Sequence, residues 1–228
     1  MTQFKIKEKQ ISVYPCDEPD RPVIYLNTFD GEGEQVLRIL RDVRDEGCPP
    51  FTLVSVSGLK WNHDMSPWKI PPVFKNAEPC TGGADDYLNF LIGRIIPEAE
   101  KEIRGTVLWR GIAGYSLAGL FSLYSLYQTD LFSRAASMSG SLWYPGITEY
   151  ISSHTMKRIP DHLYFSLGSR EAKTRSPLMK TVQENTEKME KYYSEKGIDT
   201  ILQMNPGNHY QDAEKRTAAG IRWLLERV

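Results

Sequence analysis

The sequence predicts an α/β fold: a mostly parallel, twisted sheet with helices on both faces and an antiparallel strand at the N-terminal end. Strand-like and helix-like segments alternate along most of the chain, as crossover connections in a parallel sheet require. Residues 23–26 form a short, continuous apolar run, which is typical of a strand covered on both faces. We find no repeat, low-complexity tract or linker, so residues 1–228 are interpreted as a single domain.

Composition excludes several classes of function. Lys and Arg number 28 against 29 Asp and Glu, and the formal net charge of -1 gives no electrostatic reason to expect nucleic acid or an anionic membrane surface as a partner. No apolar stretch approaches the roughly 20 residues of a membrane span, and the first residues do not form a signal peptide. We expect a cytoplasmic protein, and nothing selects its oligomeric state.

The cysteines predict neither a disulfide framework nor a metal site. The three of them, Cys16, Cys48 and Cys80, are widely spaced and odd in number. No His, Cys and carboxylate cluster has the spacing of metal ligands. We therefore expect no metal and no organic cofactor.

The first part of the chain predicts one edge strand, one buried strand and a loop suited to ligands. Residues 4–13 alternate as a half-exposed antiparallel strand would, and residues 15–22 form a polar turn. After the buried strand at 23–26, residues 27–33 form a loop at its carboxyl end. Ligands bind at such ends in open α/β sheets.

A helix, a strand, a long irregular segment and a second helix follow. Residues 35–46 have helical spacing, and residues 51–56 form the next strand. Residues 60–83 contain prolines and tryptophans without periodicity, and we interpret them as an irregular loop over the site. Residues 85–103 are predicted to be helical, with a kink or break at Pro97.

Residues 106–128 form the stretch around which the chain is organised. An apolar run predicts a strand from residue 107, a sharp turn follows at Ser116, and the next residues have the apolar pattern of a helix. The serine of such a turn has a strained backbone, so its neighbours must be small where strand and helix nearly touch. Gly114, Ala118 and Gly119 meet that requirement. A Gly/Ser turn without catalytic function is the alternative reading.

The C-terminal part continues the alternation. Residues 163–167 form a strand that ends at a glycine, and residues 176–196 form a long polar helix. A last strand at 200–204 leads into the loop 206–209, and residues 212–227 form the closing helix.

A serine nucleophile needs a base, and four histidines allow elimination. His63 lies in the irregular segment, His154 follows a surface-like helix, and His162 opens a strand at the end away from the site. His209 lies just past the last strand. It can therefore reach a serine at the carboxyl edge of the same sheet, and we predict that it is the base.

The third member of a triad orients the base, and the chain order expected for this arrangement is serine, acid, histidine. Glu171 is the first carboxylate after the strand 163–167. Asp199 precedes the last strand and Asp212 follows the histidine, so neither fits. A solvated loop charge at Glu171, with a Ser–His dyad, remains the alternative.

An oxyanion formed in acyl transfer needs two N–H donors. The residue after the nucleophile, Leu117, is expected to supply one. The loop after the strand 23–26 should supply the other, from Thr28 or Phe29.

These segments together resemble a known family. Residues 113–121 (AGYSLAGLF), 139–143 (SGSLW), 62–68 (NHDMSPW), 168–174 and 207–209 are similar to the esterase family that contains esterase D and the siderophore (enterobactin-type) esterases, within the α/β-hydrolase fold. The resemblance spans nearly the whole chain. Ala118 departs from the usual glycine, and Asn62-His63 departs from the usual basic residue before Asp64.

The resemblance implies a serine hydrolase of small-molecule carboxylic esters, with Ser116 as nucleophile, His209 as base and Glu171 as acid. Siderophore trilactones are one substrate class of such a family, and it also includes acyltransferases and thioesterases. A binding protein that keeps the fold without the chemistry is a further alternative.

Aromatic residues of the irregular segment 60–83, of the predicted turn and of residues 139–143 are candidates for the substrate pocket. They are Tyr115, Trp61, Trp68 and Trp143. Large aromatics bury much apolar area, so core packing is an equal alternative for the tryptophans.

Overall fold

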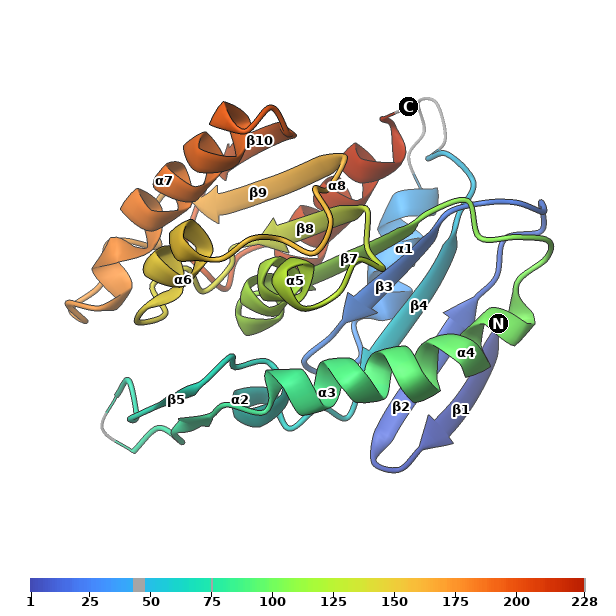
Figure 1. The fold of residues 1–228 in the computed structure, drawn as a ribbon, viewed down its shortest axis with the longest axis horizontal. Coiled ribbons are helices and arrows are strands. Elements are labelled where there is room, and N and C mark those ends of the chain that lie inside the picture. Colours follow the sequence, from blue (N-terminus) through green and yellow to red (C-terminus); the bar gives the residue numbers. More distant parts are fainter. Residues whose placement is uncertain (43–47, 75, 228) are drawn as a thin grey trace.

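Within the described residues, 1–42, 48–74 and 76–227, the computed structural model has one eight-stranded sheet (Figure 1). The strand order is β1-β2-β4-β3-β7-β8-β9-β10. The bounds are β1 Thr2–Ile6, β2 Lys9–Tyr14, β3 Val23–Asn27, β4 Thr52–Ser57, β7 Arg110–Tyr115, β8 Arg134–Met138, β9 His162–Gly168 and β10 Asp199–Asn205. In this order, neighbouring strands from β4 to β10 pair in parallel. Strand β2 pairs antiparallel with both of its neighbours, β1 and β4. The predicted fold class is confirmed.

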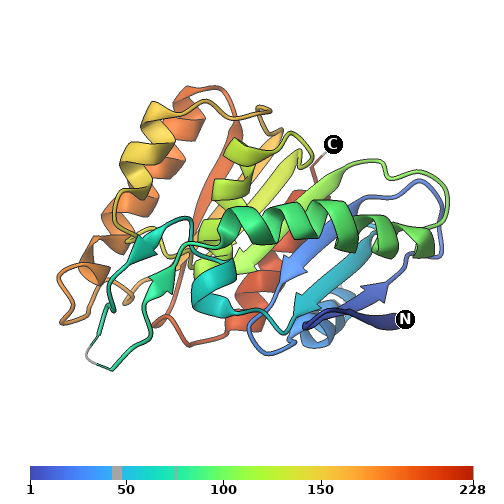
Figure 2. The same ribbon diagram turned by 60° about the horizontal axis from the view of Figure 1, so that its bottom comes forward.

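Helices cover both faces of the sheet (Figure 2). On one face, α1 (Gly33–Arg41) and α8 (Ala213–Leu225) pack side by side. The other face is covered by α3 Ala84–Phe90, α4 Ile96–Ala99, α5 Leu117–Gln128, α6 Ile147–Ser153 and α7 Val182–Glu195. Residues 117–127 of α5 are all buried, so this helix lies at the centre of its layer.

The N-terminal prediction of one strand over residues 4–13 is wrong in its bounds. Two strands, β1 and β2, form a hairpin there, and Lys7 at its turn has a φ of 53°. Alternation continues on both sides of the turn, so periodicity alone did not reveal the break.

The described residues of segment 60–83 contain more regular structure than the irregular loop that the sequence predicts. It contains the short helix α2 (Trp61–Asp64) and a two-stranded ribbon of β5 (Lys69–Ile70) and β6 (Cys80–Thr81). A buried ion pair between Lys9 and Asp64 fixes its start to the N-terminal hairpin. The ion pair and the pairing of β5 with β6 hold this segment in place. Neither produces the periodic apolar pattern by which an ordinary helix is recognised in a sequence.

The predicted helix 85–103 is interrupted, as expected from Pro97. After α3, a π-helical turn occupies Leu91–Ile95, and α4 is followed by a 3₁₀ turn at Glu100–Glu102. Proline has no N–H to give the carbonyl four residues earlier, so the bonding pattern widens: Ile96 N–H bonds to the carbonyl of Leu91.

Other predicted bounds shift by several residues. Strand β7 begins at Arg110 rather than at residue 107, and Leu108 is exposed. The helix predicted over 35–46 begins at Gly33 and ends at Arg41, and residues 43–47 lie outside the described residues. Helix α7 begins at Val182 rather than at residue 176, because a 3₁₀ turn (Met179–Thr181) precedes it.

Candidate active site

Ser116 lies at the sharp turn between β7 and α5. Its backbone has φ 59° and ψ -122°, a region that non-glycine residues rarely occupy. Such a conformation costs on the order of 1–3 kcal/mol and persists only where surrounding contacts hold it. Here the N–H of Ser116 donates to the carbonyl of Met138 at the end of β8, at 3.1 Å.

The small neighbours of Ser116 are required by contact. A Cβ on Gly114 would lie 2.4 Å from the carbonyl carbon of Ala118, where strand meets helix. A Cβ on Gly119 would lie 3.0 Å from the Cα of Gly140, in the loop after β8. Ala118 itself is accommodated, so the departure from glycine at this position leaves the turn intact.

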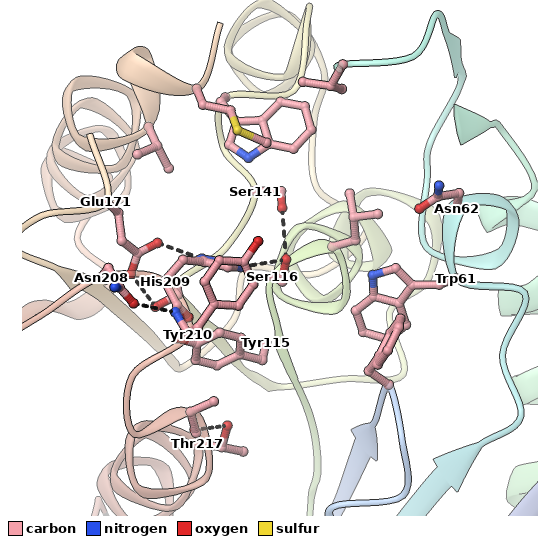
Figure 3. A pocket seen from close by; sticks show the side chains of 18 of the residues that line it. Trp61, Asn62, Tyr115, Ser116, Ser141, Glu171, Asn208, His209, Tyr210 and Thr217 are labelled. Carbon is pink, nitrogen blue, oxygen red and sulfur yellow. Dashed lines mark hydrogen bonds and ion pairs between the residues drawn. The ribbon is translucent and has the colours of Figure 1, made fainter. Parts of the chain in front are cut away.

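His209 comes from the loop after β10 and reaches the serine (Figure 3). Its Nε2 lies 3.0 Å from Oγ of Ser116. The Oγ of Ser141 lies 3.4 Å from the same oxygen. The hydroxyl of Tyr115 donates to the backbone carbonyl of His209 at 2.7 Å, which ties this loop to the end of β7.

Glu171, from the loop after β9, lies on the other side of the imidazole. Its Oε2 is 2.7 Å from Nδ1 of His209, and its side chain is only 4% exposed. Oε1 accepts from the N–H of Gly168 at 2.6 Å and from the hydroxyl of Ser139 at 2.8 Å. Burial acts to raise the pKa of Glu171, but the bonds and charge of its partners prevail, and that pKa is lowered.

A buried arginine, which sequence reasoning missed, completes this cluster. Nη1 of Arg216, on α8, lies 3.1 Å from Oε1 of Glu171, and Nη2 donates to the carbonyl of Pro206 at 2.9 Å. The sequence feature that could have revealed it is a charged residue on the apolar face of the closing helix. Arg216 lies one turn before Gly220 on this face and next to the buried Thr217.

The other three histidines have separate partners. Nδ1 of His63 lies 2.7 Å from the hydroxyl of Thr81, and His154 stacks on Tyr150. His162 pairs with Asp199 at 2.7 Å, at the start of β9 and β10 and therefore at the opposite edge of the sheet from Ser116.

The residues expected to supply N–H donors line the same cavity as Ser116. Leu117 is the first residue of α5 and lines the cavity. The N–H of Thr28 donates to the carbonyl of Val56 at 2.9 Å, so strand pairing already uses it. Phe29, the next residue, also lines the cavity, and of the two it is the better candidate for the second donor.

The serine, the histidine and the glutamate all line one cavity of about 710 Å³. The segment 60–83 forms part of its wall, with Trp61 packed edge to face on Phe29, and Trp143 and Tyr115 also line it. Phe29, Phe74 and Tyr210 are exposed apolar residues at this cavity.

Trp68 does not line this cavity, contrary to the prediction. Its ring packs against the rings of Tyr124, Tyr144 and Tyr150, and its Nε1 donates to the carbonyl of Pro145 at 2.9 Å. The alternative of core packing therefore holds at this position. The sequence alone does not show which of two nearby tryptophans faces the cavity and which packs against other aromatic side chains.

Neither a metal-binding cluster nor a membrane-spanning helix is found among the described residues. No group of three or more His, Cys, Asp or Glu side chains in that part of the chain is placed to hold a metal ion. None of its helices is both long and apolar enough to cross a bilayer.

Known proteins share this fold. Siderophore hydrolase EstA from Aspergillus nidulans is 18% identical, with a TM-score of 0.74 over 98% of this chain and 92% of that one. An IroE-like serine hydrolase from Shewanella oneidensis is 19% identical, with a TM-score of 0.77 over 99% of this chain and 79% of that one. These structural similarities establish the α/β-hydrolase fold.

Sequence comparison supplies the family. The "Uncharacterized protein YbbA" of Bacillus subtilis (strain 168) is 22% identical over 220 residues, which are 92% of this chain and 88% of that protein. A family model described as "Putative esterase" matches residues 7–212. The chain therefore belongs to this esterase family of the α/β-hydrolase fold, and it is a carboxylesterase-type enzyme.

Proposed function

We propose that the protein hydrolyses carboxylic esters through an acyl-enzyme on Ser116, with His209 as general base and Glu171 orienting the imidazole. The observation that carries the proposal is the unbroken row of hydrogen bonds from Ser116 Oγ through His209 to Glu171, at 3.0 and 2.7 Å, along the wall of an open cavity (Figure 3). The catalytic unit is the single domain of residues 1–228.

The first half-reaction forms the acyl-enzyme. Nε2 of His209 takes the proton of Ser116 as Oγ attacks the ester carbonyl, and the carbonyl oxygen becomes an oxyanion. The backbone N–H groups of Leu117 and Phe29 are the proposed donors to that oxygen. Collapse of the intermediate breaks the bond to the alcohol oxygen, and the proton on His209 passes to the leaving alcohol.

The second half-reaction regenerates the serine. His209 takes a proton from a water molecule, whose oxygen attacks the acyl carbon. The bond to Ser116 Oγ then breaks, the proton returns to Oγ, and the carboxylic acid leaves. Glu171 stays ionised throughout, because its lowered pKa favours the carboxylate that stabilises the imidazolium.

The cavity admits a small-molecule ester rather than a macromolecule. A volume of about 710 Å³ lies within the range of small-ligand sites. Apolar side chains on one wall, Phe29, Trp61 and Phe74, favour an acyl or alcohol group with apolar surface. The reaction as written requires no cofactor.

A siderophore lactone is the second candidate substrate. Arg170 and Lys173 line the wall beside Glu171, and they would attract an anionic ligand. The name of the similar Aspergillus nidulans protein, siderophore hydrolase EstA, points to the same class. Glu32, Glu78 and Glu214 line the cavity as well and oppose such a ligand. Comparing kcat/KM for a ferric tri-catecholate trilactone with that for simple acyl esters would separate the two.

Replacing Ser116 tests the proposal. We expect Ser116→Ala to lose p-nitrophenyl acetate and butyrate hydrolysis by more than about 10⁴-fold and to lose labelling by a fluorophosphonate probe. Ser152→Ala, on the exposed face of α6, is the matched control and should keep both. Parent-level hydrolysis by Ser116→Ala would refute the proposal. Transfer of the acyl group to a dilute added alcohol in preference to hydrolysis by water would indicate an acyltransferase.

A further inference from the structure

The guanidinium of Arg216 joins four parts of the catalytic edge. Its Nη1 lies 3.1 Å from Oε1 of Glu171 and 3.2 Å from both the hydroxyl of Tyr115 and the hydroxyl of Ser139. Its Nη2 donates to the carbonyl of Pro206, in the loop that carries His209. The ends of β7, β8, β9 and β10 therefore all contact this one side chain.

A cation in this position needs a reason. The side chains of Arg216 and Glu171 are 3% and 4% exposed, and removing such a pair from water carries a large desolvation cost before their mutual attraction is counted. An apolar side chain of similar volume often serves stability equally well. Stability alone therefore does not account for a guanidinium here, whereas a requirement for geometry does.

The two oxygens of Glu171 have different partners. Oε1 accepts from Gly168, Ser139 and Arg216, and Oε2 faces Nδ1 of His209. Holding Oε1 leaves the carboxylate one orientation, in which Oε2 lies in line with the imidazole. The bond from Arg216 to Pro206 acts on the same loop from the other side.

We propose that Arg216 is a positioning residue for the proposed hydrolysis. It fixes the carboxylate of Glu171 so that Oε2 receives His209, and it holds the His209 loop in register with Ser116. The inference rests on the proposed function and deepens it. A lysine reproduces the charge but not the planar fork that serves Glu171 and Pro206 at once.

Removing the positive charge of Arg216 should shift the pH dependence of activity in one direction. The groups that face Glu171 are His209 from the loop after β10, Arg216 from α8, Tyr115 from β7 and the uncharged Ser139 and Gly168. Removing the one permanent cation among these groups favours protonation of Glu171. Activity needs the ionised carboxylate, so the acid limb of the kcat/KM profile should move to higher pH.

Arg216→Met tests the proposal in the full-length enzyme with p-nitrophenyl acetate. We expect kcat to fall by about 10- to 100-fold, the loss typical of a displaced catalytic group, with KM nearly unchanged. Arg216→Lys should recover part of kcat. Arg134→Met is the matched control: Arg134 is also buried and also bonds to carbonyls near α8, at Leu224 and Arg227, but at the amino end of β8. It should keep the parent kcat and pH profile.

A double variant shows whether Arg216 acts through Glu171. In a Glu171→Ala background, Arg216→Met should lower kcat by a clearly smaller factor than in the parent, because the carboxylate that it positions is gone and only its bond to the loop of His209 remains to be lost. Removing both charges also avoids an unpaired buried ion, so the double variant remains testable if Arg216→Met does not fold. Additive losses, or a parent-like kcat and pH profile in folded Arg216→Met, would overturn the proposal.

Failure of the proposed function would look different. A parent enzyme without esterase activity, or an active Ser116→Ala, would remove the reaction itself. An active parent, an inactive Ser116→Ala and an unaffected Arg216→Met would reject only the role of Arg216.

Discussion

Nε2 of His209 lies 3.0 Å from Oγ of Ser116, although 93 positions separate the two residues. They meet because β7 and β10 belong to the same parallel part of the sheet, so that the loops after both strands lie at one edge. Glu171 follows β9, between them and beside β10. This arrangement leads to predictions for rate, for pH dependence and for stability.

Glu171→Gln should separate a triad from a dyad. Glutamine keeps the size but removes the charge that stabilises the imidazolium, so kcat for p-nitrophenyl acetate should fall by about 10²- to 10⁴-fold. KM should change little, since Glu171 acts on the base. A kcat within twofold of the parent would show that a Ser–His dyad suffices. Glu98→Gln, an exposed carboxylate on α4, serves as the control.

The same substitution should alter how stability depends on pH. The pKa of Glu171 is lowered in the fold, so its contribution is fully present above the unfolded value of about 4.3 and is lost as pH falls through the lower folded value. The difference in Tm between parent and Glu171→Gln should therefore be largest near neutral pH and shrink below pH ~4. Thermal unfolding from pH 7 to pH 3, expressed as that difference, measures it; a difference that grows on acidification would contradict the assignment.

Gly114→Ala should damage both folding and activity. The added methyl would lie 2.4 Å from the backbone of Ala118, so the free energy of unfolding should fall by at least about 1–3 kcal/mol and the Ser116 turn should shift. Gly93→Ala is the matched control, because a Cβ there meets nothing within 4 Å. It should change stability by no more than about 1 kcal/mol. Urea unfolding and the rate of fluorophosphonate labelling distinguish the two; equal behaviour would contradict the contact.

Replacing Trp68 should mainly lower stability, whereas replacing Trp143 should mainly raise KM. Trp68→Ala removes packing against Tyr124, Tyr144 and Tyr150 and should lower the free energy of unfolding by about 3 kcal/mol, with little change in KM. Trp143→Ala opens the cavity wall and should raise KM for the longer of two acyl esters with a smaller loss of stability. If Trp68→Ala raised KM as much as Trp143→Ala did, the packing of Trp68 against the tyrosines, away from the cavity, would be wrong.

Much of the fold could be predicted because it rests on local patterns. The buried run at β3 and the alternation of strands and helices determine a parallel sheet, and chain order then places residues 116, 171 and 209 at one edge. Bounds failed where no local pattern marks them. The hairpin turn at Lys7 interrupts an alternation that is continuous in sequence, and the ends of α1 and α7 depend on tertiary contacts.

The candidate site was predictable for residues that a local pattern or elimination singles out, and not for the rest. Small residues flank Ser116, and His209 is one of only four histidines. The partners of Glu171 are a backbone N–H, a serine hydroxyl and an arginine from a distant helix, and none has a local signature. Thr28 and Phe29 could not be separated without knowing that strand pairing uses one of the two N–H groups.

Segment 60–83 forms part of the cavity wall but contains none of the three residues proposed to react. It is attached through the Lys9–Asp64 pair and through the bond from Tyr144 to the Trp68 carbonyl, while the reacting groups follow β7, β9 and β10. Part of the cavity wall and the groups proposed to react thus lie in separate stretches of polypeptide. Exchanging the ribbon between Trp68 and Thr81 for that of another esterase offers a route to new ester preferences on an unchanged reaction centre.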